Sequence, residues 1–178
     1  MNPIEIINIY YPEENDLRIT LLTHSCQVAK HALAIIKRHP ELPVDEDLVY
    51  EGAMLHDIGI LHTDAPKIFC TGKHPYICHG YLGAEMLRKE GYPIHAGFCE
   101  RHTGTGLSIA RIQGANLPIP RRDMRPQTLE EEIVCYADKF YSKSRLKRVK
   151  TVEDVLHSLS KYGPEEIERF NEWHKRFG

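Results

Sequence analysis

The sequence predicts an all-α protein made of one domain. Apolar side chains recur at helical spacing through most of the chain, and only the short segment at residues 4–11 alternates convincingly with the period of two that marks a half-buried strand. Candidate helix starts and stops follow one another, with Pro and Gly between them. The 178 residues, 42% of them hydrophobic, are enough for one sizeable core. We therefore expect a single helical bundle over residues 1–178, with its core at about 16–145 and amphipathic helices at 151–178.

Two helices are expected in the first third of the chain. Residues 16–38 have an apolar stripe with His24 in its middle, and Pro40 stops them. Asp45 is a good N-cap for a second helix over residues 46–57. This second helix would end in a His-Asp pair, although a carboxylate is rarely buried unless it is paired or bound to a metal.

Further helices are predicted by their end signals. A helix over residues 78–90 is expected to stop at Gly91, and Pro93 opens a short one that ends near residue 102. Thr128 and Glu131 have the spacing of a capping box and predict a helix over residues 129–144.

The C-terminal segment carries two more helix starts, at Thr151 and Pro164, each followed by an amphipathic pattern. Three other segments lack a helical pattern. Residues 4–11 read as a leading helical turn or an irregular arm. Residues 58–76 and 103–126 are expected to be loops, because Gly and Pro punctuate them. Irregular stretches as long as the latter are uncommon unless they are functional.

Composition excludes several classes of function. A formal net charge of −2 leaves no electrostatic footprint for nucleic acid or for an anionic membrane surface. No apolar run approaches the roughly 18 residues of a membrane span, and the N-terminal segment lacks the features of a signal peptide. Five Cys without a CxxC motif suit reduced thiols. We expect a cytoplasmic protein that binds neither nucleic acid nor membrane.

Histidine is the unusual component, with 11 residues. Six His and Asp residues fall on or at the ends of predicted helices, and helices that converge on one point can build a metal centre from such side chains. Imidazole and carboxylate without thiolate favour Fe, Mn, Ni, Co or Zn. Six ligands are too many for one metal with an open position and about right for two metals that share a carboxylate. A single His on an apolar helix face is usually a packed, hydrogen-bonded core residue, so the prediction depends on the whole set. The six are His24, His56, Asp57, His79, His102 and Asp138.

The order of these six residues resembles the HD superfamily of metal-dependent phosphohydrolases. The segment "MLHDIG" looks like its HDIG signature, and "HGYLGAEML", "CERHTGTGL" and "IVCYADK" strengthen a resemblance that covers roughly residues 21–144. It implies a buried metal centre in a stand-alone HD domain. His24, His56, Asp57 and Asp138 would hold a first metal ion. Asp57 would also bridge to a second ion held by His79 and His102, which single-metal members usually lack.

The resemblance further implies hydrolysis of a phosphomonoester or phosphoanhydride of a small nucleotide-like substrate by a metal-bridging hydroxide. Asp57, Lys139 and Lys143 are the expected catalytic residues, the two lysines because residues about one helical turn past a ligand can point into the same cleft. Basic residues elsewhere could bind the substrate or simply be solvated. These are Lys73, Arg101, Arg121, Arg122 and Arg125.

Other functions stay open within the same resemblance. Some binuclear members cleave diadenosine tetraphosphate, and a few hold a mixed-valent di-iron centre and act as oxygenases. A non-catalytic nucleotide sensor is a third class, although a sensor need not keep six ligands. The resemblance also leaves open whether the chain forms a homodimer.

Overall fold

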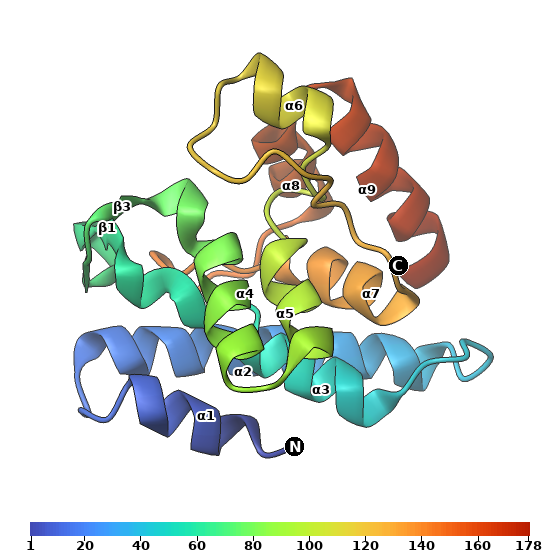
Figure 1. The fold of residues 1–178 in the computed structure, drawn as a ribbon. Coiled ribbons are helices and arrows are strands. Elements are labelled where there is room, and N and C mark those ends of the chain that lie inside the picture. The colour runs from blue at the N-terminus through green and yellow to red at the C-terminus, as the bar shows by residue number, and fades with distance from the viewer.

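The computed structural model describes all residues from 1 to 178 and has nine α-helices and one small sheet (Figure 1). The predicted all-α class is therefore confirmed in its main feature. None of the helices is long and apolar enough to cross a membrane. Helix α7 (Leu129–Asp138) packs on the helices of the first 100 residues, α9 (Pro164–Phe177) packs on α7, and α8 (Val152–Leu159) contacts α9.

The first three helices begin at residues that cap them with a side-chain oxygen. Asn2, Asn15 and Asp45 each accept a hydrogen bond from a backbone N–H of the first helical turn, at 3.0–3.1 Å. The leading segment is thus a true helix. The third helix is shorter than expected, because the chain tightens into a 3₁₀-helix, η1 (Ile58–His62), just after the His-Asp pair. The bounds are α1 (Pro3–Tyr10), α2 (Asp16–Arg38) and α3 (Glu46–Leu55).

The segment expected to be loop, residues 58–76, contains short regular elements. Strand β1 (Thr63–Ala65) pairs antiparallel with β2 (Cys70–Thr71) and parallel with β3 (His74–Pro75). Two 3₁₀-helices, η2 (Pro66–Ile68) and η3 (Tyr76–Cys78), complete the segment. The sheet was not predicted, because strands of two or three residues are too short to show an alternating pattern.

Helices α4 (His79–Lys89) and α5 (Pro93–Glu100) form the expected pair. Gly91 lies between them with φ +85°, in the left-handed region that favours glycine. This tight connection lets the two helices pack on one another along their length.

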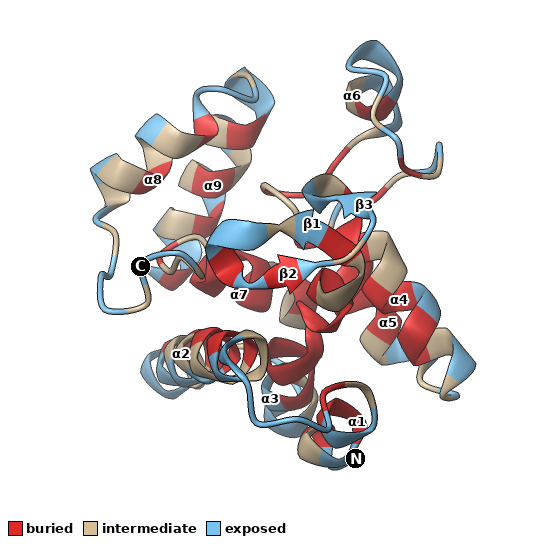
Figure 2. Cartoon of the chain, turned by 90° about the vertical axis from the view of Figure 1, so that its left-hand side faces the viewer, coloured by how far each residue is buried: buried red, intermediate tan, exposed pale blue.

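The long segment from 103 to 126 is only partly irregular. It contains a short helix, α6 (Ile109–Gly114), capped by Ser108. A β-bridge between Leu107 and Met124 ties the two ends of the segment together. Figure 2 shows α6 at the periphery of the molecule, with much of its surface exposed.

Helix α7 (Leu129–Asp138) is capped by Thr128 but ends earlier than residue 144. The capping box is incomplete, because the Glu131 side chain accepts from the Gln127 N–H instead of from the cap residue. At the end of the helix the backbone bonds change to the i→i+3 type, with the Phe140 N–H donating to the Ala137 carbonyl and the Tyr141 N–H to the Asp138 carbonyl, and the Lys150 N–H donates back to the Phe140 carbonyl at 2.8 Å. Asp138 is therefore the last residue of α7, directed into the interior.

The two C-terminal helices start where the sequence predicts, α8 (Val152–Leu159) at Thr151 and α9 (Pro164–Phe177) at Pro164. One continuous core joins the two ends of the chain, from Ile6 on α1 to Phe177 on α9. The apolar face of α9 packs on α7, and Phe170 stacks on Tyr136. Helix α9 thus packs directly against α7, the helix that ends in Asp138.

Candidate metal centre

The six predicted ligands come from five separate parts of the chain, and all of them are buried. Each lies at a place where a helix can direct it inward. His24 lies within α2, His56 and Asp57 follow α3, His79 opens α4, His102 follows α5, and Asp138 ends α7.

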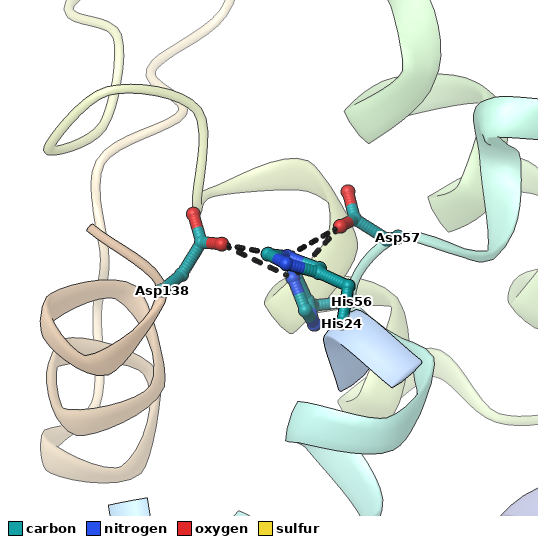
Figure 3. Close-up of side chains that lie close together, drawn as sticks. All are labelled: His24, His56, Asp57 and Asp138. Atoms are coloured by element: carbon teal, nitrogen blue, oxygen red, sulfur yellow. Dashed lines mark ion pairs between the residues drawn. The ribbon is translucent and has the colours of Figure 1, made fainter. Parts of the chain in front are cut away.

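Four of the six form a first group of possible ligands, with their donor atoms within 4.8 Å of one another. The two imidazoles lie between the two carboxylates (Figure 3). His24 Nε2 is 3.1 Å from Asp57 Oδ2 and 2.9 Å from Asp138 Oδ1. His56 Nε2 is 3.0 Å and 3.6 Å from the same two oxygen atoms. Two nitrogens and two carboxylate oxygens facing one point are a suitable donor set for a divalent transition metal.

The second group contains Asp57 again, with His79 and His102. In this group the other oxygen of the Asp57 carboxylate faces the imidazoles. Asp57 Oδ1 is 3.4 Å from His79 Nε2 and 3.3 Å from His102 Nε2. Asp57 thus turns one oxygen to each group. A carboxylate placed in this way can bridge two cations.

The orientation of three of the rings is set by the main chain. The Nδ1–H groups of His56, His79 and His102 donate to backbone carbonyls three residues earlier, at 2.7, 2.7 and 2.8 Å. This leaves Nε2 of each ring directed into the cluster, as metal-ligating histidines generally are.

One contact in the cluster is explained by a cation. His79 Nε2 lies 2.9 Å from His102 Nε2. Burial lowers the pKa of both rings, that of His79 to about 3. Because each ring is then neutral and its proton is on Nδ1, two lone pairs face each other. A cation next to both nitrogens would convert this repulsion into ligation, so the residues present fit a metal ion.

The charges of the cluster also favour a cation. Burial alone would raise the pKa of Asp57, but His56 and Lys143 hold it well below its usual range. The pKa of Asp138 is likewise low, against the effect of burial, because of Lys139 and the neighbouring imidazoles. Burial opposes a charge on His56 as well, yet Asp57 and Asp138 raise its pKa to about 9. The two carboxylates therefore stay ionised and favour positive charge between them.

The two lysines after Asp138 reach the same cluster. Lys143 Nζ lies 2.5 Å from Asp57 Oδ2, and Lys139 Nζ lies 2.8 Å from Asp138 Oδ2. Lys139 also donates to the His102 carbonyl at 3.0 Å. Burial lowers the pKa of Lys139, but Asp138 outweighs this effect and raises it to about 12. Both ammonium groups are therefore charged and lie beside the two carboxylates.

A cavity of about 310 Å³ opens onto the cluster at His79, His102 and Asp138. Two further lysines, Lys150 and Lys161, also line it. Neither lysine is marked by a sequence motif. They lie 12 and 23 residues beyond Asp138, and only the turn after α7 and the packing of α8 bring them back.

The five other basic residues proposed to bind substrate lie elsewhere, and none of them lines this cavity. Arg101 pairs with Glu131 at 2.6 Å, Arg122 pairs with Glu100, and Arg125 pairs with Asp123. The other two, Lys73 and Arg121, are exposed. Their assignment to substrate binding stays a prediction.

The cluster described above could hold divalent metal ions, in an almost entirely helical fold. The model of the HD domain family matches residues 21–142, and the chain belongs to this family.

Relatives with curated names share part of their sequence with the chain. It is 35% identical over 144 residues to an uncharacterized protein of Methanocaldococcus jannaschii, covering 79% of this chain and 76% of that one. It is 31% identical over 152 residues to a tRNA (cytidine(56)-2'-O)-methyltransferase of Picrophilus torridus, covering 82% of this chain. The match spans only 41% of that methyltransferase.

Solved structures with the same fold include the HD domain of the L. monocytogenes phosphodiesterase PgpH. Its TM-score is 0.54 at 19% identity, and the match covers 96% of this chain and 94% of that domain. The same domain in complex with cyclic-di-AMP gives a TM-score of 0.53 at 18% identity. These likenesses establish the shared fold.

Proposed function

We propose that this protein is a metal-dependent phosphohydrolase with a binuclear centre, acting on a phosphate ester or anhydride of a nucleotide-like molecule. The observation that carries the proposal is the position of Asp57. Its two oxygens face two different groups of ligands, one with His24, His56 and Asp138 and the other with His79 and His102. A site for a single metal ion would not need the second group.

Divalent cations in such a site supply Lewis acidity and an activated water. The protein supplies the rest. Three backbone carbonyls fix the imidazole rings, and Lys139 and Lys143 stand at the edge of the cluster, where the phosphate must enter. Their ammonium groups would bind the non-bridging phosphate oxygens and neutralise charge that develops during hydrolysis. The buried walls around Asp57 limit the access of bulk water.

Two comparisons support this proposal. HD domain membership agrees with a metal-dependent hydrolase, and PgpH, which shares the fold, is a phosphodiesterase whose HD domain binds cyclic-di-AMP. The methyltransferase name attached to one relative gives no support for a second function, because this chain matches less than half of that protein.

The test combines metal analysis of the purified full-length protein with a screen for phosphate release from nucleotides, phosphomonoesters and phosphodiesters. We expect two metal ions per chain and turnover of at least one class of compound. Asp57→Asn keeps the size of the side chain and removes its charge, so it should reduce metal content and lower turnover by several orders of magnitude. Lys143→Ala should raise KM and leave metal content unchanged.

Three results would overturn the proposal. One is wild-type turnover in a metal-free Asp57→Asn variant. Another is a protein that binds a single ion. The third is an iron-containing protein that consumes oxygen and releases no phosphate, which would favour the oxygenase chemistry known for a few HD proteins.

A further inference from the structure

Three cavities meet at one lysine beside the metal centre. The cavity of about 310 Å³ at His79 and Asp138 includes Lys150. A second cavity, of about 370 Å³, runs from Lys150 toward Lys67 and Tyr141. A third, also about 370 Å³, runs from Lys150 over α8 to Arg148. Lys150 is thus the residue that all three hollows share.

The Lys150 ammonium has no ionic partner. Both lysines nearest the cluster are paired with carboxylates, whereas no Asp or Glu oxygen lies within 4.0 Å of Lys150 Nζ. Asp154 lines the cavity over α8 together with Lys150, but it already has partners. Its Oδ2 accepts hydrogen bonds from Arg148 at 2.8 Å and from the Thr151 N–H.

Lys150 is also only partly solvated. Burial lowers the pKa of its ammonium group, and the charges of Lys139 and Lys143 act in the same direction, against Asp138 and Asp154. A cation that is half-buried beside other cations is unfavourable unless an anion binds to it. The site is therefore complementary to negative charge.

A second unpaired lysine extends this basic surface. Lys161 lines both the cavity at the metal centre and the one over α8, and it makes no ion pair. Ser158 lines the same two cavities, and its hydroxyl donates to the Asp154 carbonyl at 2.8 Å. The cavity at the candidate metal centre is therefore lined by His and Asp side chains of the cluster and by four lysines, of which Lys150 and Lys161 have no ionic partner.

We propose that Lys150 and Lys161 form a second phosphate subsite, so that the substrate is a phosphoanhydride with at least two linked phosphate groups. This inference rests on the proposed hydrolase function and narrows its substrate class. One phosphate lies at the metal centre beside Lys139 and Lys143. The next phosphate extends to Lys150 and Lys161 within the same cavity of about 310 Å³. Simple monoesters leave this second subsite unused.

The test measures binding of pyrophosphate and of orthophosphate to the purified full-length protein by calorimetry, at constant ionic strength. Lys150→Gln and Lys161→Gln remove one charge each and keep most of the side-chain stem. The backbone N–H of Lys150 still bonds to Phe140, so the turn should stay folded, which thermal unfolding checks. Lys147→Gln is the matched control, because Lys147 is exposed in the same segment and lines none of the three cavities.

We expect the wild-type protein to bind pyrophosphate about tenfold more tightly than orthophosphate. Each of the two variants should weaken pyrophosphate binding about fivefold and leave orthophosphate binding unchanged, while Lys147→Gln binds both like the wild type. Extraction of metal by pyrophosphate would affect all these proteins alike. Equal affinities for the two anions, or an equal loss in the control, would overturn the proposal.

The two proposals can fail separately. Pyrophosphate binding that depends on Lys150, in a protein that hydrolyses no phosphate compound, would support the subsite and reject the hydrolase. Phosphate release by a protein whose Lys150→Gln and Lys161→Gln variants bind pyrophosphate normally would support the hydrolase and reject the subsite.

Discussion

Gly59, two residues after Asp57, tests whether close backbone packing holds the candidate metal centre together. A Cβ atom built on Gly59 would lie 2.2 Å from the His79 carbonyl oxygen, 2.4 Å from the Gly83 nitrogen and 2.8 Å from the Gly83 Cα. All three atoms belong to the backbone of α4, so no side chain can rotate away. Because nonbonded atoms normally approach to about 3.5 Å, Gly59→Ala must move η1 and α4 apart by roughly 1 Å.

The energetic cost follows from this displacement. Overpacking a core usually destabilises a protein by about 1–3 kcal/mol, and a clash with rigid backbone belongs at the upper end. We expect Gly59→Ala to lower the free energy of unfolding by about 3 kcal/mol. His79 should move with α4, so metal bound by the second group of ligands should decrease as well.

The assay is urea denaturation of the metal-free proteins, followed by metal analysis of the loaded ones. Gly114→Ala is the control, because nothing lies within 4 Å of a Cβ atom at this helical position. It should be neutral or stabilising by up to about 1 kcal/mol. A Gly59→Ala protein within about 0.5 kcal/mol of the wild type would show that the backbone contact is not as close as the structure has it.

The remaining predictions concern single side chains. His79→Ala should reduce the metal content from two ions per chain to one, measured by elemental analysis, and two retained ions would contradict the binuclear assignment. Glu166→Gln should destabilise the protein by about 1–2 kcal/mol in urea denaturation, because Glu166 Oε2 accepts from the Thr105 N–H and hydroxyl at 2.6 and 2.8 Å; no change would mean that this buried link contributes nothing. Burial, assisted by the charge of Arg38, lowers the pKa of His31, so the unfolded state binds its proton first as the pH falls. The stability due to His31 is therefore complete above about pH 6.5 and is lost below it, and His31→Phe should flatten the decline of stability between about pH 7 and 5; an unchanged slope would exclude this cause.

The six candidate metal ligands could be picked out from the sequence because their chemistry is unusual for their positions. A His in the apolar stripe of a helix and a His-Asp pair at a helix end conflict with ordinary burial preferences, and such conflicts often mark a functional site. The structure brings all six residues into two groups. The resemblance to HD proteins supplied the division into those groups, which spacing alone could not give.

The helices with clear end signals were also predictable, whereas elements defined by tertiary contacts were not. Asp45, Gly91, Thr151 and Pro164 mark real helix ends because capping is a local property. The end of α7 is instead followed by tight turns and by a backbone bond between Lys150 and Phe140, which joins residues that no local sequence pattern connects.

The basic residues of the site were the hardest to predict. A lysine is typical of any exposed surface, and its sequence neighbours do not reveal whether it faces a cavity. Arg101 and Arg122 pair with Glu131 and Glu100, and their role in substrate binding stays a prediction, while Lys150 and Lys161, which the sequence did not single out, line the cavity. Only the three-dimensional structure distinguishes basic residues that line the cavity from those that pair with carboxylates elsewhere.

The main-chain acceptors of the ligand histidines have a consequence for how the site can change. His56, His79 and His102 each donate to a carbonyl within their own turn of the chain. A side-chain acceptor can be lost by a single substitution, but a carbonyl is present whatever residue occupies the position. The side chains of the residues that supply these carbonyls can therefore be substituted while the imidazole rings keep their orientation. The entrance could be remodelled for a different substrate without rebuilding the metal centre.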